Sequence, residues 1–441
     1  MGKRLYFILI LLLLLGFYLN YLPHNQYKYP LHVDEWTHLT YAKHLNYDTP
    51  LYFSDQGKSL EHGFHILLAV LDSIGVNYLL MFNLFPAFFS VLISLALFIL
   101  VRKYFDEASA LFSVFFFIML ESSNALLGSM FLVPLSLGLF FIPIGLFLVN
   151  SRLLFLVIAF TLVMHPFSGI ALLILLNCFL LNEIIETKRI NYKLILQQII
   201  GIVLALPLFL DPLLEKGLGN LQFNTSIIPF YFIPRVFGYL IMGIILIGFY
   251  LIAYQRKYVF NTYILVMLSL ILVYYQFRFN FLIFYERNLM YLFESFSIPF
   301  GVFFGCVIGK IKKYQVFFIL VLLIVLGIFM LPGKVESTKQ VYHIINENEY
   351  SDFMYIRENL NGKAVLDPWK AIAFTPIAER EIYSRIPPGP NEIYLNRNEE
   401  VFSFFNQSCS NLTFLEENNI KIVYGECKGL RKVKNNIFVY G

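Results

Sequence analysis

A succession of eleven apolar segments, separated by mostly short polar connections, constrains this chain more than any other feature of its sequence. A helix that crosses a bilayer needs about 20 mostly apolar residues. The first segment lacks the small-residue cleavage site of a signal peptide, so we expect it to stay as an anchor. The pattern predicts a polytopic α-helical membrane protein with about 11 spans. These are residues 5–22, 79–101, 108–121, 126–149, 153–164, 170–185, 194–210, 236–254, 259–275, 289–308 and 316–331.

The composition excludes an ordinary soluble protein. Hydrophobic residues make up 58% of the chain and charged residues 14%, whereas soluble domains are about 45–50% apolar and about 25% charged. The net charge of +4 is small for 441 residues, so nothing indicates a nucleic-acid partner. The partner that the composition predicts is the lipid bilayer.

The charged residues are concentrated toward the C-terminal end. Residues 333–441 hold 27 charges in 109 residues, against 35 in the first 332. We therefore expect a transmembrane module at 1–332 and a soluble α/β domain at 333–441. Cys409 and Cys427 are the only cysteines of that domain and are candidates for a disulfide. Its expected helices are 350–360 and 412–418, and its expected strands are 363–366, 381–386, 420–424 and 436–440.

The distribution of Lys and Arg predicts the orientation in the membrane. Basic residues favour cytoplasmic connections. Alternate connections, together with the N-terminal end, carry 13 Lys and Arg, whereas the longer connections on the other side carry 7. The N-terminus is therefore expected in the cytoplasm, and an odd number of spans would place the C-terminal domain outside. The protein is predicted to be a multi-pass component of the cell membrane.

The first outer loop, residues 23–77, holds the candidate catalytic side chains. Asp34, His38 and Tyr41 are spaced at i, i+4 and i+7, so they share one face of a predicted helix. Glu35 follows Asp34 directly. A carboxylate at this place is a candidate general base.

Two other parts of this loop point to the membrane surface. The helix face beside Asp34 carries Trp36, Leu39 and Lys43, which would suit a helix lying on the bilayer. The stretch 64–74 is apolar but too short to span, and we expect it to form an interfacial helix.

Other interpretations of the acidic pair stay open. Acidic residues favour the first turn of any helix, and Asp34 would serve as an ordinary N-cap. Glu35 and His38 form a Glu-x-x-His pattern like that of carboxylate di-metal bundles, which makes a divalent metal an open alternative. Such bundles need a second copy of the pattern, and the chain has none. No cofactor is therefore assigned.

At these residues the sequence resembles a family, the GT-C membrane glycosyltransferases, which include protein O-mannosyltransferases and the lipid A aminoarabinose transferase type. Asp34-Glu35-Trp-Thr-His38 is similar to their loop-one signature, and the layout of anchor, long loop, many spans and outer domain is similar too. The resemblance implies transfer of a sugar from a polyprenyl-phosphate donor at the outer membrane face, with Asp34 and Glu35 catalytic. The acceptor is left open among protein, glycan and lipid.

The chain departs from parts of the family pattern. It has no Trp-Trp-Asp run, because Trp36 and Trp369 are its only tryptophans, and this argues against an oligosaccharyltransferase. Some relatives carry a second acidic pair in the next outer loop, where this chain offers only Glu121.

The remaining substrate-binding candidates lie at the outer ends of other predicted spans. The departing phosphate needs cationic donors, and Arg287 and Arg235 are the candidates. An alternative for Arg287 is an anchor paired with Glu286 that reaches to the interface. His165 could equally form a structural His-Pro turn. With these arginines, the candidates for binding the donor or acceptor are His38, Tyr41, His65, Glu121 and His165.

Two other classes of protein compete with the glycosyltransferase hypothesis. A non-catalytic scaffold with an outer binding domain would not need the loop-one carboxylate. A secondary transporter would favour broken helices in two matching halves and polar residues near the midplane. The predicted spans carry little midplane charge, and the polar residues gather at one face, which favours the transferase.

Overall fold

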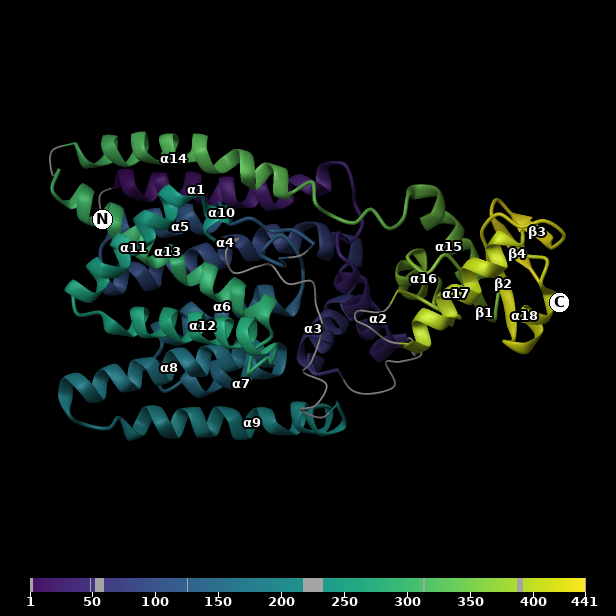
Figure 1. Cartoon of the computed structure of the whole chain (residues 1–441), viewed down its shortest axis with the longest axis horizontal. Helices are drawn as coiled ribbons and strands as arrows, with labels where there is room; N and C mark the ends of the chain where they lie inside the picture. The colour runs from purple at the N-terminus through teal and green to yellow at the C-terminus, as the bar shows by residue number, and fades with distance from the viewer. Residues whose placement is uncertain are drawn as a thin grey trace.

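The computed structural model describes residues 3–47, 49–51, 59–124, 126–216, 233–311, 314–386 and 392–440. A bundle of long helices is joined at one end to a smaller α/β domain (Figure 1). The bundle consists of α1 (Lys3–Tyr21), α4 (Tyr78–Tyr104), α5 (Glu107–Ile118), α6 (Pro134–Phe147), α7 (Leu154–Met164), α8 (Pro166–Thr187), α9 (Tyr192–Lys216), α10 (Ile233–Phe237), α11 (Tyr239–Tyr254), α12 (Tyr258–Phe277), α13 (Tyr285–Gly309) and α14 (Gln315–Ser337).

Six of these helices are long and apolar enough to cross a membrane, and five shorter apolar helices have 10–17 residues. Six candidate spans do not establish the expected count of about 11. One boundary also differs from the expectation, because α6 begins only at Pro134. Proline is well placed in the first turn of a helix, where its missing N–H is not needed. The preceding residues 126–133 contain no regular helix, and they pass close to the first outer loop.

Helix α13 forms the centre of the bundle and packs against α5, α11 and α12. Gly301 and Gly305 of α13 lie against Ser109 and Ser113 of α5, so closely that a Cβ at either glycine would clash. Small residues allow this close approach between membrane helices. The contact fixes the height of α13, and with it the position of Arg287 in the first turn of the helix.

Two helices of the long loop 23–77 lie between the bundle and the C-terminal domain (Figure 1). They are α2 (Val33–Tyr47) and α3 (His62–Ser73), and a short 3₁₀ helix, η1 (Leu22–Asn25), precedes them. Helix α3 packs against α7 and α9, and α2 packs against α3 and α16. Figure 1 shows the N-terminus at the end of the bundle that is farthest from the C-terminal domain.

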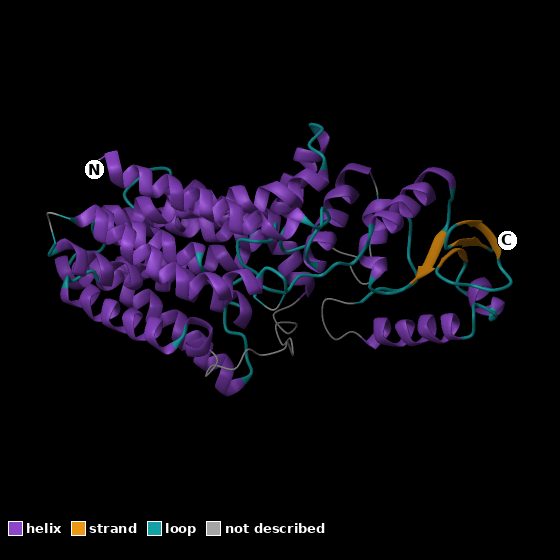
Figure 2. Ribbon diagram, turned by 90° about the horizontal axis from the view of Figure 1, so that it is seen from above, coloured by secondary structure: helices purple, strands orange, loops and turns teal. Residues whose placement is uncertain are grey.

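The C-terminal domain contains α15 (Glu347–Asn359), α16 (Lys370–Ala378), α17 (Glu392–Asn406) and α18 (Leu412–Glu417). Its sheet has the order β1-β2-β4-β3 and lies at the far end of the molecule (Figure 2). The strands are β1 (Lys363–Leu366), β2 (Ile420–Tyr424), β3 (Arg431–Lys434) and β4 (Ile437–Val439). Among the strands that the structure describes, β1 and β2 pair in parallel and the other pairs are antiparallel. A disulfide joins Cys409 and Cys427.

Two expectations for this domain need correction. The strand expected at 381–386 is reduced to a single bridge between Ile382 and Ala364, and Arg385 near its end donates to the Thr37 hydroxyl of α2 at 3.5 Å. The apolar run expected to end at Pro332 continues as helix through to Ser337. Lys334, near the end of that helix, is buried and donates a hydrogen bond to the Leu120 carbonyl at 2.7 Å.

Candidate functional site

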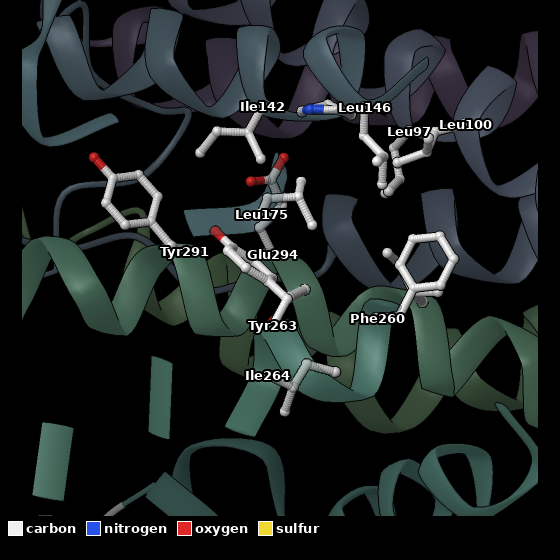
Figure 3. A pocket seen from close by; sticks show the side chains of 13 residues that line it. Leu97, Leu100, Ile142, Leu146, Leu175, Phe260, Tyr263, Ile264, Tyr291 and Glu294 are labelled. Atoms are coloured by element: carbon white, nitrogen blue, oxygen red, sulfur yellow. The ribbon is translucent and has the colours of Figure 1, made fainter. Parts of the chain in front are cut away.

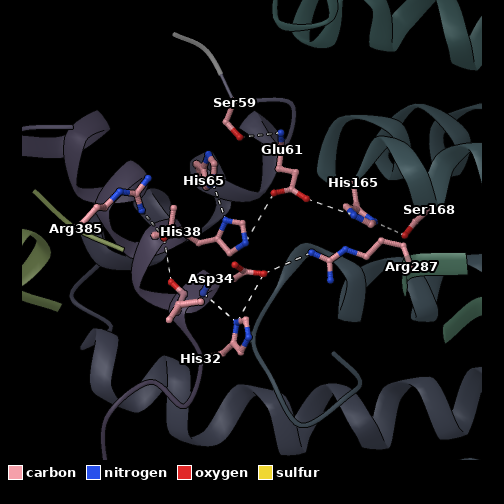
Figure 4. Close-up of polar contacts among 12 residues, drawn as sticks. His32, Asp34, His38, Ser59, Glu61, His65, His165, Ser168, Arg287 and Arg385 are labelled. Atoms are coloured by element: carbon pink, nitrogen blue, oxygen red, sulfur yellow. Dashed lines mark hydrogen bonds and ion pairs between the residues drawn. The ribbon is translucent and has the colours of Figure 1, made fainter. Parts of the chain in front are cut away.

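The site begins with an ion pair between two elements that are far apart in the sequence. Asp34, in the first turn of α2, lies 3.5 Å from the Arg287 guanidinium, in the first turn of α13. Both side chains are about one quarter exposed. Because α2 begins at Val33, Asp34 lies within the helix rather than at its cap. Figure 4 shows this contact between the Asp34 carboxylate and the Arg287 guanidinium.

The alternative pairing of Arg287 with Glu286 is not observed. Glu286 Oε1 is buried and makes no hydrogen bond within the described part of the chain. The guanidinium instead reaches across to the loop-one helix.

Arg287 and two histidines determine the charge state of Asp34. Burial would raise the pKa of this carboxyl, but His32, Arg287 and His38 together lower the pKa below its ordinary value. Burial lowers the pKa of His32, and it lowers that of His38 to about 4. A guanidinium stays charged throughout the physiological pH range, so Arg287 is the one of the three groups that acts on Asp34 over this whole range.

Glu61 links two histidines from different parts of the chain. Its Oε2 lies 3.8 Å from His38 Nε2, and its Oε1 lies 3.4 Å from His165 Nε2. Glu61 comes immediately before α3, and its side chain is 20% exposed. The sequence provided a weak signal for this residue, because Glu61-His62 stands in the same loop as Asp34 but forms no known motif.

His165 is held from the other side by two hydroxyl groups. It stands at the break between α7 and α8 and is 1% exposed. Its Nδ1 lies 2.6 Å from Ser168 Oγ, and Ser168 Oγ lies 2.7 Å from the Tyr291 hydroxyl. The His-Pro turn is thus a structural feature that also directs an imidazole into the site.

The predicted shared face of α2 is observed. His38 Nδ1 lies 2.9 Å from His65 Nε2 of α3. Tyr41 stacks on the His65 ring, with 4.7 Å between ring centroids and 6° between ring planes. Asp34, His38 and Tyr41 therefore all face the cluster or its supporting ring.

Glu35 points away from this cluster and is completely buried. Its Oε2 accepts hydrogen bonds from the backbone N–H groups of Leu31 at 2.7 Å and His32 at 3.0 Å. Its Oε1 accepts one from the N–H of Leu132 at 2.6 Å. Glu35 therefore ties α2 to the segment before α6, which makes it a supporting residue in this structure.

The helix face expected to lie on the bilayer is covered by protein instead. Trp36, Leu39 and Lys43 are 0–4% exposed, because α16 of the C-terminal domain packs against α2. Lys43 Nζ lies 3.1 Å from Glu379 Oε1. The expectation was wrong because the sequence alone does not reveal that the C-terminal domain returns to this helix.

The structure does not join the expected residue Glu121 to the cluster, and it does not describe the side chain of Arg235. Glu121 lies beside Gly333 at the C-terminal end of α14, and no contact recorded for the described residues joins it to Asp34. Arg235 lies in α10, but its side chain is outside the part of the chain that the structure describes.

A small cavity lies deeper in the bundle, beyond Tyr291 (Figure 3). It measures about 30 Å³ and is lined by apolar side chains together with Tyr263, Tyr291 and Glu294. That volume holds about two water molecules. Glu294 Oε1 and the Tyr263 hydroxyl are buried without a hydrogen-bond partner among the described residues. The cavity adjoins the site through Tyr291 but is too small for a sugar.

The residues of the cluster do not fit a metal ion as they stand. Within the described residues, no group of three or more His, Cys, Asp or Glu side chains could hold one. The Arg287 guanidinium lies against Asp34, where it would repel a second cation. Glu35 and His38, the two ends of the Glu-x-x-His pattern, bind different partners.

Comparison with solved structures identifies the fold. The chain is similar to the oligosaccharyltransferase AglB of the archaeon Archaeoglobus fulgidus, in complex with an inhibitory peptide and a dolichol-phosphate. The TM-score is 0.61 at 11% identity, over 96% of this chain and 69% of that one. Two further structures of the oligosaccharyltransferase from that organism match at TM-scores of 0.58 and 0.56. One is complexed with Zn and sulfate, at 12% identity over 94% of this chain and 67% of that one. The other is tethered to an acceptor peptide containing the Asn-Val-Thr sequon, at 11% identity over 96% and 69%.

This similarity shows that the chain shares the overall fold of these oligosaccharyltransferases. No family model matches the chain, and no curated protein sequence matches it. At 11–12% identity the likeness concerns the fold alone, so the reaction must be argued from the residues of this chain.

Proposed function

We propose that the protein is a membrane glycosyltransferase that moves a sugar from a polyprenyl-phosphate donor to an acceptor hydroxyl at the outer membrane face. The observation that carries the proposal is the Asp34–Arg287 pair at 3.5 Å. The pair brings together a carboxylate and a guanidinium, a group suited to binding phosphate, at the end of a bundle whose fold is similar to that of oligosaccharyltransferases. An acceptor-activating base and a donor for the leaving phosphate are the two groups that this reaction needs.

In the proposed reaction Asp34 removes the proton from the acceptor hydroxyl as its oxygen attacks the anomeric carbon. A new C–O bond forms, and the bond between that carbon and the phosphate oxygen breaks. The electron pair stays with the polyprenyl phosphate, whose added negative charge Arg287 stabilises. We assign no step to a metal, because the donor set around Asp34 does not fit one.

Donor binding would also switch on the base. While Arg287 is paired with Asp34, its charge lowers the pKa of that carboxyl and makes it a weak base. A bound phosphate competes for the same guanidinium, since bidentate phosphate pairing suits arginine. As Arg287 turns to the phosphate, the pKa of Asp34 rises, so proton removal follows donor binding.

The experiment is incubation of the purified protein with a panel of polyprenyl-phosphate sugars, followed by measurement of sugar loss from the lipid. General bases contribute about 10²–10⁴-fold, so we expect Asp34→Asn to lose that much transfer and still insert. If Asp34→Asn has activity near the wild-type level, Asp34 has a structural role and is not the base. If no lipid in the panel loses its sugar, the result would instead favour a non-catalytic membrane scaffold.

The acceptor is proposed only as a hydroxyl compound. The acceptor peptide in the similar structure belongs to that protein, and this chain lacks a Trp-Trp-Asp run. Isotope-labelled donor supplied to membranes that contain the protein would reveal whether protein, glycan or lipid becomes labelled.

A further inference from the structure

We propose that an aromatic path formed by Trp369 and Tyr342 binds the acceptor as a glycan, by stacking on its sugar rings and directing one end of it to Asp34. This inference rests on the proposed function and narrows the acceptor from any hydroxyl compound to a carbohydrate chain. It starts from the exposure of the two tryptophans, because Trp369 is 42% exposed whereas Trp36 is completely buried.

The path leads from the surface of the molecule to the proposed base. The Trp369 ring lies 5.5 Å from the Tyr342 ring, and the Tyr342 ring lies 5.6 Å from the His32 ring, measured between centroids. His32 Nδ1 accepts a hydrogen bond from the Asp34 N–H at 3.1 Å. Exposure falls along this path, since Trp369 is exposed, Tyr342 is half-buried and His32 is buried. A ligand that covers the two outer rings is therefore directed toward Asp34.

The backbone fixes the positions of the two outer rings. The N–H of Tyr342 donates to the Leu31 carbonyl at 3.0 Å. Trp369 is the N-cap residue of α16, and its N–H donates to Asp367 Oδ1 at 2.9 Å. Because α16 packs against α2, the C-terminal domain brings Trp369 close to the helix that carries Asp34.

A polar cleft of about 470 Å³ adjoins the path. It is lined by His343 and Lys370, which directly follow the two path residues in the sequence. Its volume lies within the range of ordinary ligand sites, about 300–1,000 Å³. Tyr29 also lines the cleft and stands five positions before Asp34. At about 3.6 Å per residue at most, their Cα atoms lie within about 18 Å of each other, so an elongated acceptor in the cleft can present one end to Asp34.

The chemistry of the cleft favours a neutral, hydroxyl-rich ligand. Lys28 lies 2.7 Å from Glu347, and their side chains are 47% and 66% exposed. Lys370 lies 2.5 Å from Glu349. A polyanion or a polycation would meet like charge in each pair, whereas a hydroxyl group both donates and accepts hydrogen bonds. Trp and Tyr combine a broad apolar face with a polar end, which matches the C–H face and the hydroxyl rim of a sugar ring.

A peptide acceptor has a weaker match at this place. Extended peptides commonly bind by adding a strand to the edge of a sheet. Figure 1 shows α15 and α16 on the side of the C-terminal domain that faces the bundle, and Figures 1 and 2 show the sheet at the far end of the molecule. The sheet edges therefore lie away from the path.

Trp369 can report on its own occupancy, because the only other tryptophan, Trp36, is 0% exposed. The full-length protein in lipid nanodiscs is titrated with acrylamide, which quenches the fluorescence of exposed indoles, in the presence of each probe. The probes are oligosaccharides of glucose, mannose and galactose, and a peptide rich in Ser and Thr. We expect an oligosaccharide to protect the exposed indole, and Trp369→Phe to lack the protected signal. Nanodiscs of brominated lipid test the alternative that Trp369 is a membrane-interface anchor.

Transfer kinetics test the role of the path in the reaction. With the protecting oligosaccharide as acceptor, Trp369→Ala and Tyr342→Ala should raise the KM for the acceptor by about 10- to 100-fold, the cost of one aromatic anchor. The kcat and the KM for the lipid donor should stay within about twofold, because the lost contact is made before and during the reaction alike. Trp369→Phe keeps a flat ring and should lose less. The control Phe402→Ala removes a ring of α17 that is 46% exposed and should match the wild type.

Other outcomes overturn the inference. If no oligosaccharide protects Trp369, or if the peptide alone does, the path does not bind a glycan. Quenching of Trp369 by brominated lipid makes it an interface anchor. A fall in kcat together with a lower unfolding temperature, for Trp369→Phe as well as Trp369→Ala, makes it structural. If an oligosaccharide protects Trp369 but no lipid donor loses its sugar, the proposed function is wrong, and the path is a glycan-binding surface without the acceptor role.

Discussion

Arg287 makes the sharpest prediction for a single residue, because Arg and Lys carry the same charge but different hydrogen-bond geometry. We expect Arg287→Lys to weaken use of the donor by about 1.5–3 kcal/mol, the value of a hydrogen bond to a charged group. The measurement is the donor-concentration dependence of transfer, beside a thermal-unfolding check. A lower unfolding temperature with unchanged donor dependence would make Arg287 a membrane-interface anchor.

Arg287 also determines the pH range over which Asp34 is ionised. The pKa of Asp34 is lowered in the folded protein, so the base is ionised above this lowered pKa. Transfer should therefore be lost only as the pH falls through it. Arg287→Gln removes the positive charge, and the acid limb of the pH profile should move to higher pH. The profile of the ratio kcat/KM tests this, and an unmoved acid limb would show that Asp34 is not the titrating base.

The adjacent acid, Glu35, is expected to behave differently from Asp34. Its carboxylate accepts three backbone N–H bonds at 2.6–3.0 Å. Glu35→Gln turns one acceptor oxygen into a donor, so at least one buried N–H loses its partner. We expect a loss of about 2–3 kcal/mol in the free energy of unfolding, measured by denaturant titration. A fully stable but inactive Glu35→Gln would instead indicate that Glu35 takes part in the chemistry.

At the scale of elements, the contact between α2 and α16 holds the helix that carries Asp34. Glu379 lies at the end of α16, 3.1 Å from Lys43 of α2 and 2.9 Å from Arg357 of α15. Lys43 is 4% exposed, so Glu379→Gln leaves a buried ammonium without its carboxylate. We predict destabilisation of about 3 kcal/mol and faster amide hydrogen exchange in α2.

A second ion pair of the same domain provides the matched control. Lys363 and Glu381 lie 3.3 Å apart, and Glu381 is more than half exposed. Glu381→Gln should cost less than about 1 kcal/mol and leave exchange in α2 unchanged. If Glu379→Gln and Glu381→Gln lower the free energy of unfolding by the same small amount, the C-terminal domain does not hold α2 in place.

The elements that the sequence predicted well are those with a strong local pattern. Strands 363–366 and 420–424 were placed at the residues where they occur, because short apolar runs bounded by turn residues suffice to mark them. Helices α16 and α17 and strand β3 were missed. Helix α16 carries an internal proline at Pro376, and β3 is a largely exposed strand with three basic residues. These elements are stabilised by packing against other parts of the chain, and the local sequence pattern does not show such packing.

The same limit applies to the site. The i, i+4 spacing predicted that Asp34 and His38 would share a face. Arg287 was predicted as a phosphate ligand, but its pairing with Asp34 spans more than 250 residues, and no local pattern encodes it. Glu61 forms no motif in the sequence, because the two histidines that face it, His38 and His165, lie far from it in the chain. Asp34 and Glu35 are adjacent acids in the sequence. Only the structure shows that Glu35 accepts hydrogen bonds from backbone N–H groups, whereas Asp34 faces Arg287.

At the scale of the whole molecule, the arrangement of the ends predicts the orientation without a count of spans. Figure 1 shows the N-terminus and the C-terminal domain at opposite ends of the helical bundle. If the bundle spans the bilayer, these two parts lie on opposite sides of the membrane. The excess of Lys and Arg in the connections near the N-terminal end then assigns that end to the cytoplasm.

The chemistry of the C-terminal domain gives the same orientation independently. Its Cys409–Cys427 disulfide belongs in an oxidising compartment, because the cytoplasm keeps thiols reduced. We therefore predict that protease applied to intact cells removes a tag placed after Gly441 and spares one placed before Met1. A maleimide that cannot cross the membrane should label Cys409 and Cys427 on intact cells only after reduction. A C-terminal tag that stays protected while the cells are intact, and is cut once they are opened, would reverse the orientation. It would then place Asp34 and Arg287 on the cytoplasmic face, because α2 lies at the same end of the bundle as the C-terminal domain.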